Sequence, residues 1–144
     1  MLDLTASANR EGRIIARTLM AMLVAQGALD WRPGQLALAG LGQRVEIHHM
    51  VPRKMLKRIV GRNGDDNPIG ILTPISASRN GSYRDKNPAD VVEELGADAA
   101  PIFTSHRVDD ELLGGFSASR VKLVKLLEDR DRRLKDFVIS SLGL

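Results

Sequence analysis

Two adjacent histidines, His48 and His49, are the residues of this chain best suited to chemistry. They end a β-like run that begins at Val45, and Pro52 follows and stops the strand. Neighbouring side chains on a strand point to opposite faces, so one imidazole can bind a metal ion while the other reaches a different part of the same site. The pair is therefore a candidate for a metal-assisted site at the end of a strand. On these residues alone, a hydrogen-bonded structural pair is the more common explanation.

Basic side chains surround this pair. Between residues 44 and 62 the only acidic residue is Glu46, whereas the cations are Arg44, Arg53, Lys54, Lys57, Arg58 and Arg62. A local cationic field beside candidate catalytic groups suits a polyanionic substrate such as nucleic acid. On charge alone, a solvated basic face explains the same cluster equally well.

Composition narrows the chemistry that such a site can use. The chain has 144 residues, of which 43% are hydrophobic, so it can bury a core as one domain. It has no cysteine, which excludes disulfides, thiolate zinc sites and cysteine nucleophiles. Any metal must then be bound by His, Asn or carboxylate groups.

The N-terminal part of the sequence bears on localisation. The first residues contain no basic region, and the apolar stretch over residues 14–29 is interrupted by Arg17 and Gln26. These features predict neither a signal peptide nor a membrane span. We therefore expect a cytoplasmic protein that does not enter a membrane.

Periodicity and turn residues predict the elements that must position the histidines. Helical spacing predicts a first helix over residues 8–26, ended by Gly27, and a short helix over residues 53–60. One or two helical turns are predicted over residues 89–95. A final helix is predicted to be capped by Ser117 or Ser119 and to run to about Ser141. Residues 69–75 form an apolar run, and residues 96–115 are predicted to be mostly connector. We expect Trp31 to lie in the core, and His106 to be either structural or exposed.

These motifs resemble those of the HNH (ββα-metal) nucleases. The resemblance is carried by His48-His49-Met50-Val51-Pro52, Ile69-Gly-Ile-Leu-Thr-Pro-Ile-Ser76, Asn80 and Asp85-Lys86-Asn-Pro88. It is closest to the C-terminal nuclease half of GmrSD-type restriction and phage-defence enzymes, and it extends over nearly the whole chain. In those enzymes a ParB/sulfiredoxin-like nucleotide-binding domain precedes the nuclease half. The resemblance implies such a domain as a partner, for a chain that is either an excised domain or a stand-alone relative.

The resemblance also implies a role for individual residues. In HNH nucleases with paired histidines, the first binds a single divalent metal ion, here His48, and the second is the general base, here His49. Asn80 matches the last motif position, a further metal ligand, and Mg²⁺ or Mn²⁺ is the expected ion. A phosphate clamp can be formed by Lys86, Arg84 and Arg79, and DNA contacts by Arg53, Lys54, Lys57 and Arg58. Glu46 shares a strand face with His48, and can be a third ligand or a partner of Arg44 or Arg53.

The sequence departs from the family pattern at one position. The middle asparagine of the motif, which usually braces the loop and orients the base, falls on Ile71. Asn63 or Asn67 can reach the same place. Three functions stay open, of which the first two are an active nuclease and a catalytically degenerate HNH-fold module that binds nucleic acid or regulates. A helical protein-interaction domain, which would bind neither metal nor DNA, is a third.

The residues and the resemblance together predict an α+β fold, namely a mainly helical domain around a ββα-metal (HNH-like) core. One domain is expected, with a helical scaffold over 1–43, the ββα-metal core over 44–95, and a connector with a long helix over 96–144. The expected function is a divalent-metal-dependent DNA endonuclease or nickase that hydrolyses phosphodiester bonds in restriction or phage defence.

Overall fold

The computed structural model describes residues 10–32, 44–60, 69–116 and 120–143 of the chain. Its elements are, in chain order, α1 (Arg10–Ala25), β1 (Val45–His49), α2 (Arg53–Val60), the 3₁₀-helix η1 (Ile69–Ile71), β2 (Leu72–Ser76), α3 (Ala77–Tyr83), α4 (Pro88–Leu95), the 3₁₀-helix η2 (Gly96–Asp98), α5 (Ala99–Ser105), α6 (Asp110–Gly115) and α7 (Arg120–Leu142).

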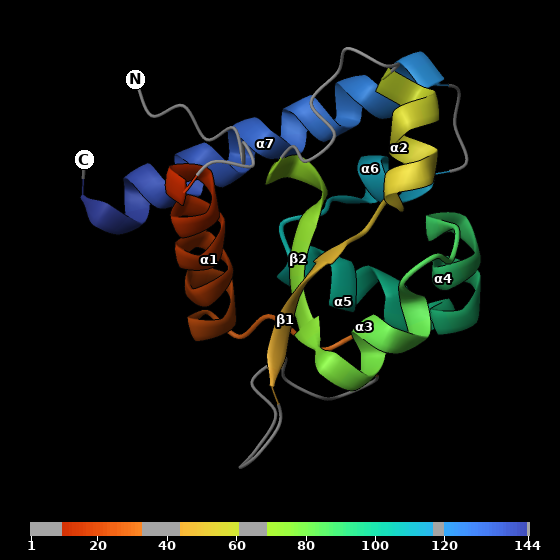
Figure 1. Cartoon of the computed structure of the whole chain (residues 1–144), viewed down its shortest axis with the longest axis horizontal. Coiled ribbons are helices and arrows are strands. Elements are labelled where there is room, and N and C mark those ends of the chain that lie inside the picture. Colours follow the sequence, from red (N-terminus) through yellow and green to blue (C-terminus); the bar gives the residue numbers. More distant parts are fainter. Residues whose placement is uncertain (1–9, 33–43, 61–68, 117–119, 144) are drawn as a thin grey trace.

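A small antiparallel sheet of β1 and β2 lies in the middle of the molecule, with helices around it (Figure 1). Its register places Val45 opposite Ser76 and His49 opposite Leu72. β2 passes directly into α3, whereas α2 and η1 lie between the two strands along the chain. The predicted α+β fold, mainly helical with little strand, is confirmed.

The edge of β2 that faces away from β1 is closed by side chains. Alternate residues of an antiparallel strand direct their backbone groups away from the partner strand, and here these are Leu72, Pro74 and Ser76. Pro74 has no N–H group, the Ser76 N–H donates to Asp30 Oδ1 at 2.9 Å, and the Leu72 carbonyl accepts from Arg130 Nη2 at 2.9 Å. These contacts satisfy polar groups that would otherwise be buried without partners, because every residue of β2 is buried.

Arg130 joins α7 to the sheet. Its side chain is fully buried and donates to the carbonyl oxygens of Gly70, Leu72 and His106, at 2.5, 2.9 and 2.9 Å. Burial lowers the pKa of this guanidinium from its ordinary value to about 9. The long final helix is therefore fixed to the start of β2 and to the turn after α5.

His106 is buried and structural, which is one of the two alternatives expected from the sequence. Its Nε2 donates to the Leu29 carbonyl at 2.6 Å, since a carbonyl can only accept. Nδ1 then accepts from the Thr73 hydroxyl, 2.5 Å away. Burial lowers the pKa of His106 to about 4, so the ring is neutral near pH 7.

Most predicted helices are confirmed, and one prediction is wrong. α1 ends before Gly27, which has a φ of 88°, and Trp31 is buried as expected. Residues 96–115, predicted as connector, instead form η2, α5 and α6. α6 begins at a side-chain cap, in which Asp109 accepts from the Leu112 N–H at 2.8 Å. Ser117 and Ser119, the predicted caps of the last helix, lie outside the described residues.

Among the helices that the structure describes, none combines the length and the apolar character needed to cross a membrane.

Candidate active site

His48 and Asn80 come together although they lie on different elements. His48 is near the end of β1, and Asn80 lies within α3, which packs against β1. The His48 Nδ1 atom and the Asn80 Oδ1 atom are 2.7 Å apart. The structure thus places the two predicted metal ligands in direct contact.

The environment of His48 keeps its ring neutral. Its side chain is only 3% exposed, and burial lowers its pKa from 6.5 to about 4, although the hydrogen bond with Asn80 acts in the opposite direction. The ring of Trp31 packs edge-to-face against it, with ring centroids 4.8 Å apart. A neutral imidazole held in one orientation is the form that can bind a metal ion.

Glu46 completes a chain of contacts across the same face of β1. Asn80 Nδ2 donates to Glu46 Oε2 at 2.7 Å, and the other carboxylate oxygen of Glu46 accepts from Arg44. The hydrogen bond from Asn80 and then that from Arg44 lower the pKa of Glu46, and the charge of Arg84 adds to the effect. Arg84, predicted to bind phosphate, therefore lies on the same side of the molecule as His48 and Asn80.

His49, the predicted general base, follows His48 on β1 and pairs with Leu72 in the sheet register. Its side chain is half-buried. The alternation of a strand directs it to the face opposite His48, so the two imidazoles occupy different environments.

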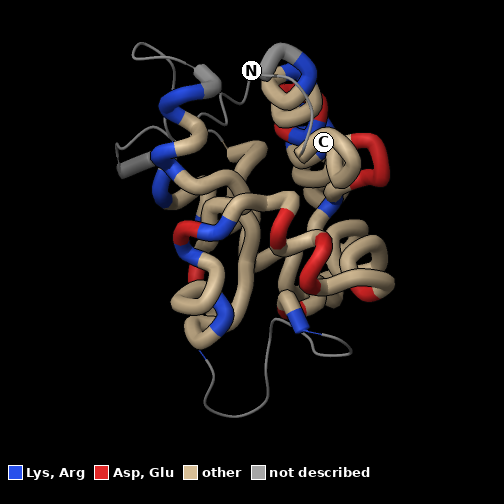
Figure 2. The backbone as a smooth tube through the Cα atoms, turned by 90° about the vertical axis from the view of Figure 1, so that its right-hand side faces the viewer, with Lys and Arg blue, Asp and Glu red and all other residues tan. Residues whose placement is uncertain are grey.

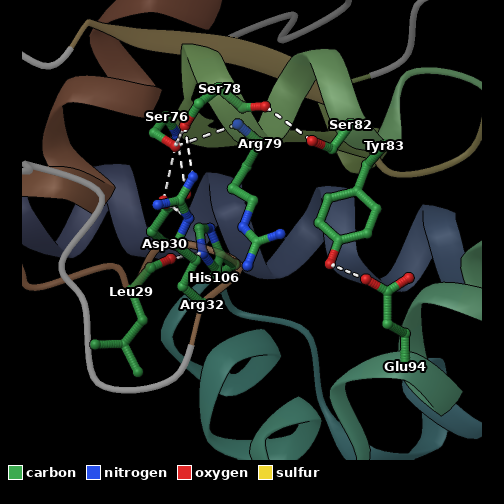
Figure 3. A network of polar contacts seen from close by, with 10 residues as sticks. All are labelled: Leu29, Asp30, Arg32, Ser76, Ser78, Arg79, Ser82, Tyr83, Glu94 and His106. Atoms are coloured by element: carbon green, nitrogen blue, oxygen red, sulfur yellow. Dashed lines mark hydrogen bonds and ion pairs between the residues drawn. The ribbon is translucent and has the colours of Figure 1, made fainter.

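A polar network on the other side of α3 fixes where this helix begins (Figure 3). The buried Asp30 accepts from the Ser76 N–H at 2.9 Å and from the Ser76 hydroxyl at 2.7 Å. Arg32 donates to the Ser78 hydroxyl at 2.7 Å. Because Trp31 lies between Asp30 and Arg32, the same turn positions both α3 and the ring that packs on His48.

Two of the predicted phosphate-binding cations gather around a different residue, Tyr83 (Figure 3 shows the Arg79 side). The Arg79 guanidinium lies 5.5 Å and the Lys86 ammonium 4.9 Å from the centre of its ring. Lys86 also pairs with Glu94 at 2.5 Å, which is the main reason that the pKa of Lys86 is raised. The structure brings neither cation into contact with His48 or Asn80 among its described interactions.

The predicted DNA-binding residues of α2 form a basic run along one short helix. Arg53, Lys54, Lys57 and Arg58 are all exposed, with no acidic residue among them (Figure 2). The helix is held by its opposite side, where Leu56 is buried. Since α2 starts shortly after His49, this surface adjoins the end of β1.

The position of the missing motif asparagine has a clear structural role. The Ile71 side chain is completely buried, and its carbonyl oxygen accepts from the Met50 N–H at 2.8 Å. Backbone groups thus fix the chain just beyond His49, where a side-chain brace was expected. Asn63 and Asn67, the possible substitutes, lie outside the described residues.

The donor set fits one kind of metal better than another. Within the described ranges there is no group of three or more His, Cys, Asp or Glu side chains that could hold an ion, so a closed structural zinc site is not formed there. The 2.7 Å between His48 Nδ1 and Asn80 Oδ1 is a hydrogen-bond distance, and it places an imidazole and a carboxamide side by side as two candidate ligands. Two protein ligands, with water and phosphate oxygens completing the shell, suit such a hard ion.

Several contacts that shape this site could not be predicted from local sequence. Asp30 and Trp31 act on residues of β1, β2 and α3 that lie far along the chain. The contact between Glu46 and Asn80 likewise joins distant segments. Comparisons of the chain with protein-family models, with curated proteins and with solved structures found no match.

Proposed function

We propose that this protein is a divalent-metal-dependent DNA endonuclease or nickase, built on an HNH-like unit of β1, β2 and α3. The observation that carries the proposal is the 2.7 Å contact between His48 Nδ1 and Asn80 Oδ1, next to a second histidine and a basic helix. A restriction or phage-defence role in the cytoplasm, with a nucleotide-binding domain as partner, follows from the sequence resemblance and is part of the proposal.

The roles of the residues follow from their environments. His48 and Asn80 would hold one Mg²⁺ or Mn²⁺ ion. When bound, such an ion neutralises charge on the scissile phosphate and assists the leaving oxygen. His49, on the other face of β1, accepts the proton of the attacking water.

Cations around the site would bind the DNA backbone. The exposed side chains of α2 provide a sequence-independent contact whose strength falls with salt. Arg84, whose charge helps to lower the pKa of Glu46, would be one of the cations that meet a phosphate beside His48 and Asn80. Lys86 would first have to exchange Glu94 for a phosphate oxygen.

A degenerate nucleic-acid-binding module is the second candidate. It is favoured by Ile71, whose buried apolar side chain occupies the position of the asparagine that orients the base in the family. Such a module would keep the metal and the basic surface and lack turnover.

Calorimetry with Mn²⁺ and a plasmid-nicking assay test the proposal together. We expect His48→Ala and Asn80→Ala each to weaken Mn²⁺ binding by at least about 10-fold and to abolish nicking, because each removes a ligand. Their helical circular dichroism should match that of the wild type. The matched control is Glu111→Ala, an exposed carboxylate of α6, which should bind and nick normally.

Each outcome distinguishes the candidates. Mn²⁺ affinity that is unchanged in both ligand variants would remove the metal site and with it the proposed function. Wild-type protein that binds Mn²⁺ and DNA but never nicks would identify the degenerate module.

A further inference from the structure

The two outer edges of the sheet differ. The edge of β2 is closed, since Pro74 lacks an N–H group and the side chains of Asp30 and Arg130 engage other backbone groups. Closure matters because an open strand edge is a row of unpaired N–H and C=O groups, with which another chain can pair. The outer edge of β1 has no comparable closure among the residues that the structure describes.

The alternation of the strand determines which groups of β1 point outward. The Arg44 carbonyl accepts from the Ala77 N–H at 2.8 Å, just before the ladder begins. Every second residue after Arg44 therefore directs its backbone groups to β2. Val45 and Ile47 direct theirs to the other side, where the described part of the chain provides no hydrogen-bond partner. The N–H and C=O groups of these two residues form the open part of the edge.

A mainly apolar cavity of about 290 Å³ lies beside this open edge, between α1 and β1 (Figure 1). Val45 and Ile47 line it, and they lie on the strand face opposite to that of His48. The other lining residues are Arg17, Met20, Ala21, Val24 and Glu46. We call the open edge and the cavity together the β1 groove. It joins unpaired backbone groups to a hollow that can take a side chain.

The chemistry of the β1 groove fits an extended peptide. A strand added to β1 would pair with Val45 and Ile47 through its backbone, and its alternate side chains would point into the cavity. Main-chain hydrogen bonds then provide affinity, while the cavity selects an apolar side chain. DNA matches this surface poorly, because phosphate oxygens cannot pair with carbonyl oxygens and gain nothing from an apolar lining.

Arg17 adds a preference for an acidic partner. Its side chain is exposed and lines the cavity, and within the described ranges it has no carboxylate partner. Glu46, the acidic residue of the groove, is already engaged by Arg44 and Asn80. The groove therefore presents an available cation, which a carboxylate of the added strand can meet.

We propose that the β1 groove binds an extended segment of another protein as a third strand of the sheet, with an apolar side chain in the cavity and an acidic side chain at Arg17. This inference goes beyond the proposed nuclease function and does not depend on it. A chain that binds no metal ion could still add a strand at β1.

The probe for this site is a short fluorescent peptide of alternating valine and threonine, with one aspartate two positions from a central valine. Fluorescence anisotropy with the full chain measures its affinity. Amide hydrogen exchange followed by NMR reports where it binds. We expect the Val45 and Ile47 amides to become protected on binding, whereas the amides of Glu46 and His48 are protected before and after.

Backbone methylation of the peptide tests the pairing itself. An N-methyl group on a peptide amide that faces β1 should weaken binding by about 3- to 10-fold, because one hydrogen bond is lost. The same group on an amide of the opposite edge should leave the affinity unchanged.

Variants of the chain test the cavity and the edge separately. Ala21→Phe fills the cavity and should weaken binding by at least about 10-fold, because an apolar side chain can no longer be buried there. The matched control is Ala25→Phe, an exposed position of α1 outside the lining, which should bind as the wild type does. Val45→Pro removes an outward N–H at the first residue of β1, where proline is tolerated, and should weaken binding by about 3- to 10-fold.

Charge reversal tests the role of Arg17. Arg17→Glu should bind a peptide with lysine in place of aspartate about 2- to 5-fold more tightly than it binds the original peptide. The wild type should show the opposite preference.

Several results would overturn the inference. They include a peptide that does not bind, that binds without protecting Val45 and Ile47, or that binds Ala21→Phe as tightly as the wild type. Protection of these two amides in the free chain would show that the chain itself covers the edge, and a dimer in sedimentation without peptide would show that a second copy does. Displacement of the peptide by a DNA duplex, with the same response to Ala21→Phe, would assign the groove to nucleic acid.

Discussion

Two buried histidines, His48 and His106, are held neutral by the interior of this molecule. Each has a pKa lowered to about 4, with burial as the largest cause. Their surroundings serve different ends. His106 uses both ring nitrogens to join Leu29 and Thr73, whereas in the described part of the chain the hydrogen bond of His48 is made through Nδ1, with Asn80. Both ring nitrogens of His106 are therefore engaged in structural hydrogen bonds, whereas the surroundings of His48 suit a metal ligand.

The same burial predicts how stability depends on pH. The folded pKa values lie below the value of about 6.5 in an unfolded chain, so the unfolded state binds more protons and stability falls as pH drops from about 6.5 towards 4. At about pH 5 the loss should be on the order of 2 kcal/mol for each histidine. Urea unfolding at about pH 7.5 and about pH 5 measures it, because most carboxylates stay ionised between these pH values.

His106→Gln provides the control, because its amide does not titrate. This variant should be less stable than the wild type near neutral pH, and should lose less stability on acidification. Equal urea midpoints of the wild type at the two pH values would contradict the neutral, buried state of these rings.

At the scale of single residues, a short motif could be recognised from the sequence, and the roles assigned to its residues stay predictions. His48, His49 and Asn80 could be proposed from spacing and resemblance, and the structure places His48 against Asn80. The contact of Glu46 with Asn80 could not be predicted, because it depends on a helix that returns to β1 from far along the chain. Charge alone could not show that Lys86 pairs with Glu94, since both are surface residues of separate segments.

Some of the secondary-structure elements were likewise predictable from the sequence, and others were not. α1, α2 and α7 were predictable because their apolar residues recur with helical spacing over at least two turns. α5 and α6 were missed because they span only seven and six residues, too short for a periodic signal. The side chain of Asp109 caps α6 locally, and both helices are stabilised by the packing of Phe103 and Leu112 in the core, which is a tertiary effect.

A glycine marks the closest approach between two of these elements. A Cβ atom at Gly70 in η1 would lie 2.5 Å from the backbone oxygen of Leu127 in α7, a distance that cannot be relieved by turning a side chain. Gly70→Ala should therefore destabilise the protein by about 1 to 3 kcal/mol in urea unfolding, because α7 must move away from the start of β2.

The matched control for this substitution is Gly114→Ala in α6, where a Cβ atom meets nothing within 4 Å. Alanine there should stabilise the helix by about 0.5 to 1 kcal/mol. A Gly70→Ala variant at least as stable as the wild type would contradict the close packing of α7 on η1.

On the scale of the whole molecule, the helices act as a frame that presents one small strand–strand–helix unit. α7 is fixed to β2 by Arg130, the turn with Trp31 supports His48, and α2 carries exposed cations next to the end of β1 (Figure 1). The histidines and Asn80 thus rest on rigid elements, while the basic side chains stay accessible. This division is what a metal-dependent nuclease requires, because the ligands must keep their geometry while a polyanion binds.

The central claim is that His49 is the general base of a site whose metal is held by His48 and Asn80. Single-turnover cleavage of a supercoiled plasmid by His49→Ala, in Mn²⁺ and at saturating protein, tests it most directly. We predict that this variant binds Mn²⁺ and DNA as the wild type does and cleaves about 10²- to 10⁴-fold more slowly, the usual contribution of a positioned base. Cleavage by His49→Ala at the wild-type rate would contradict the claim.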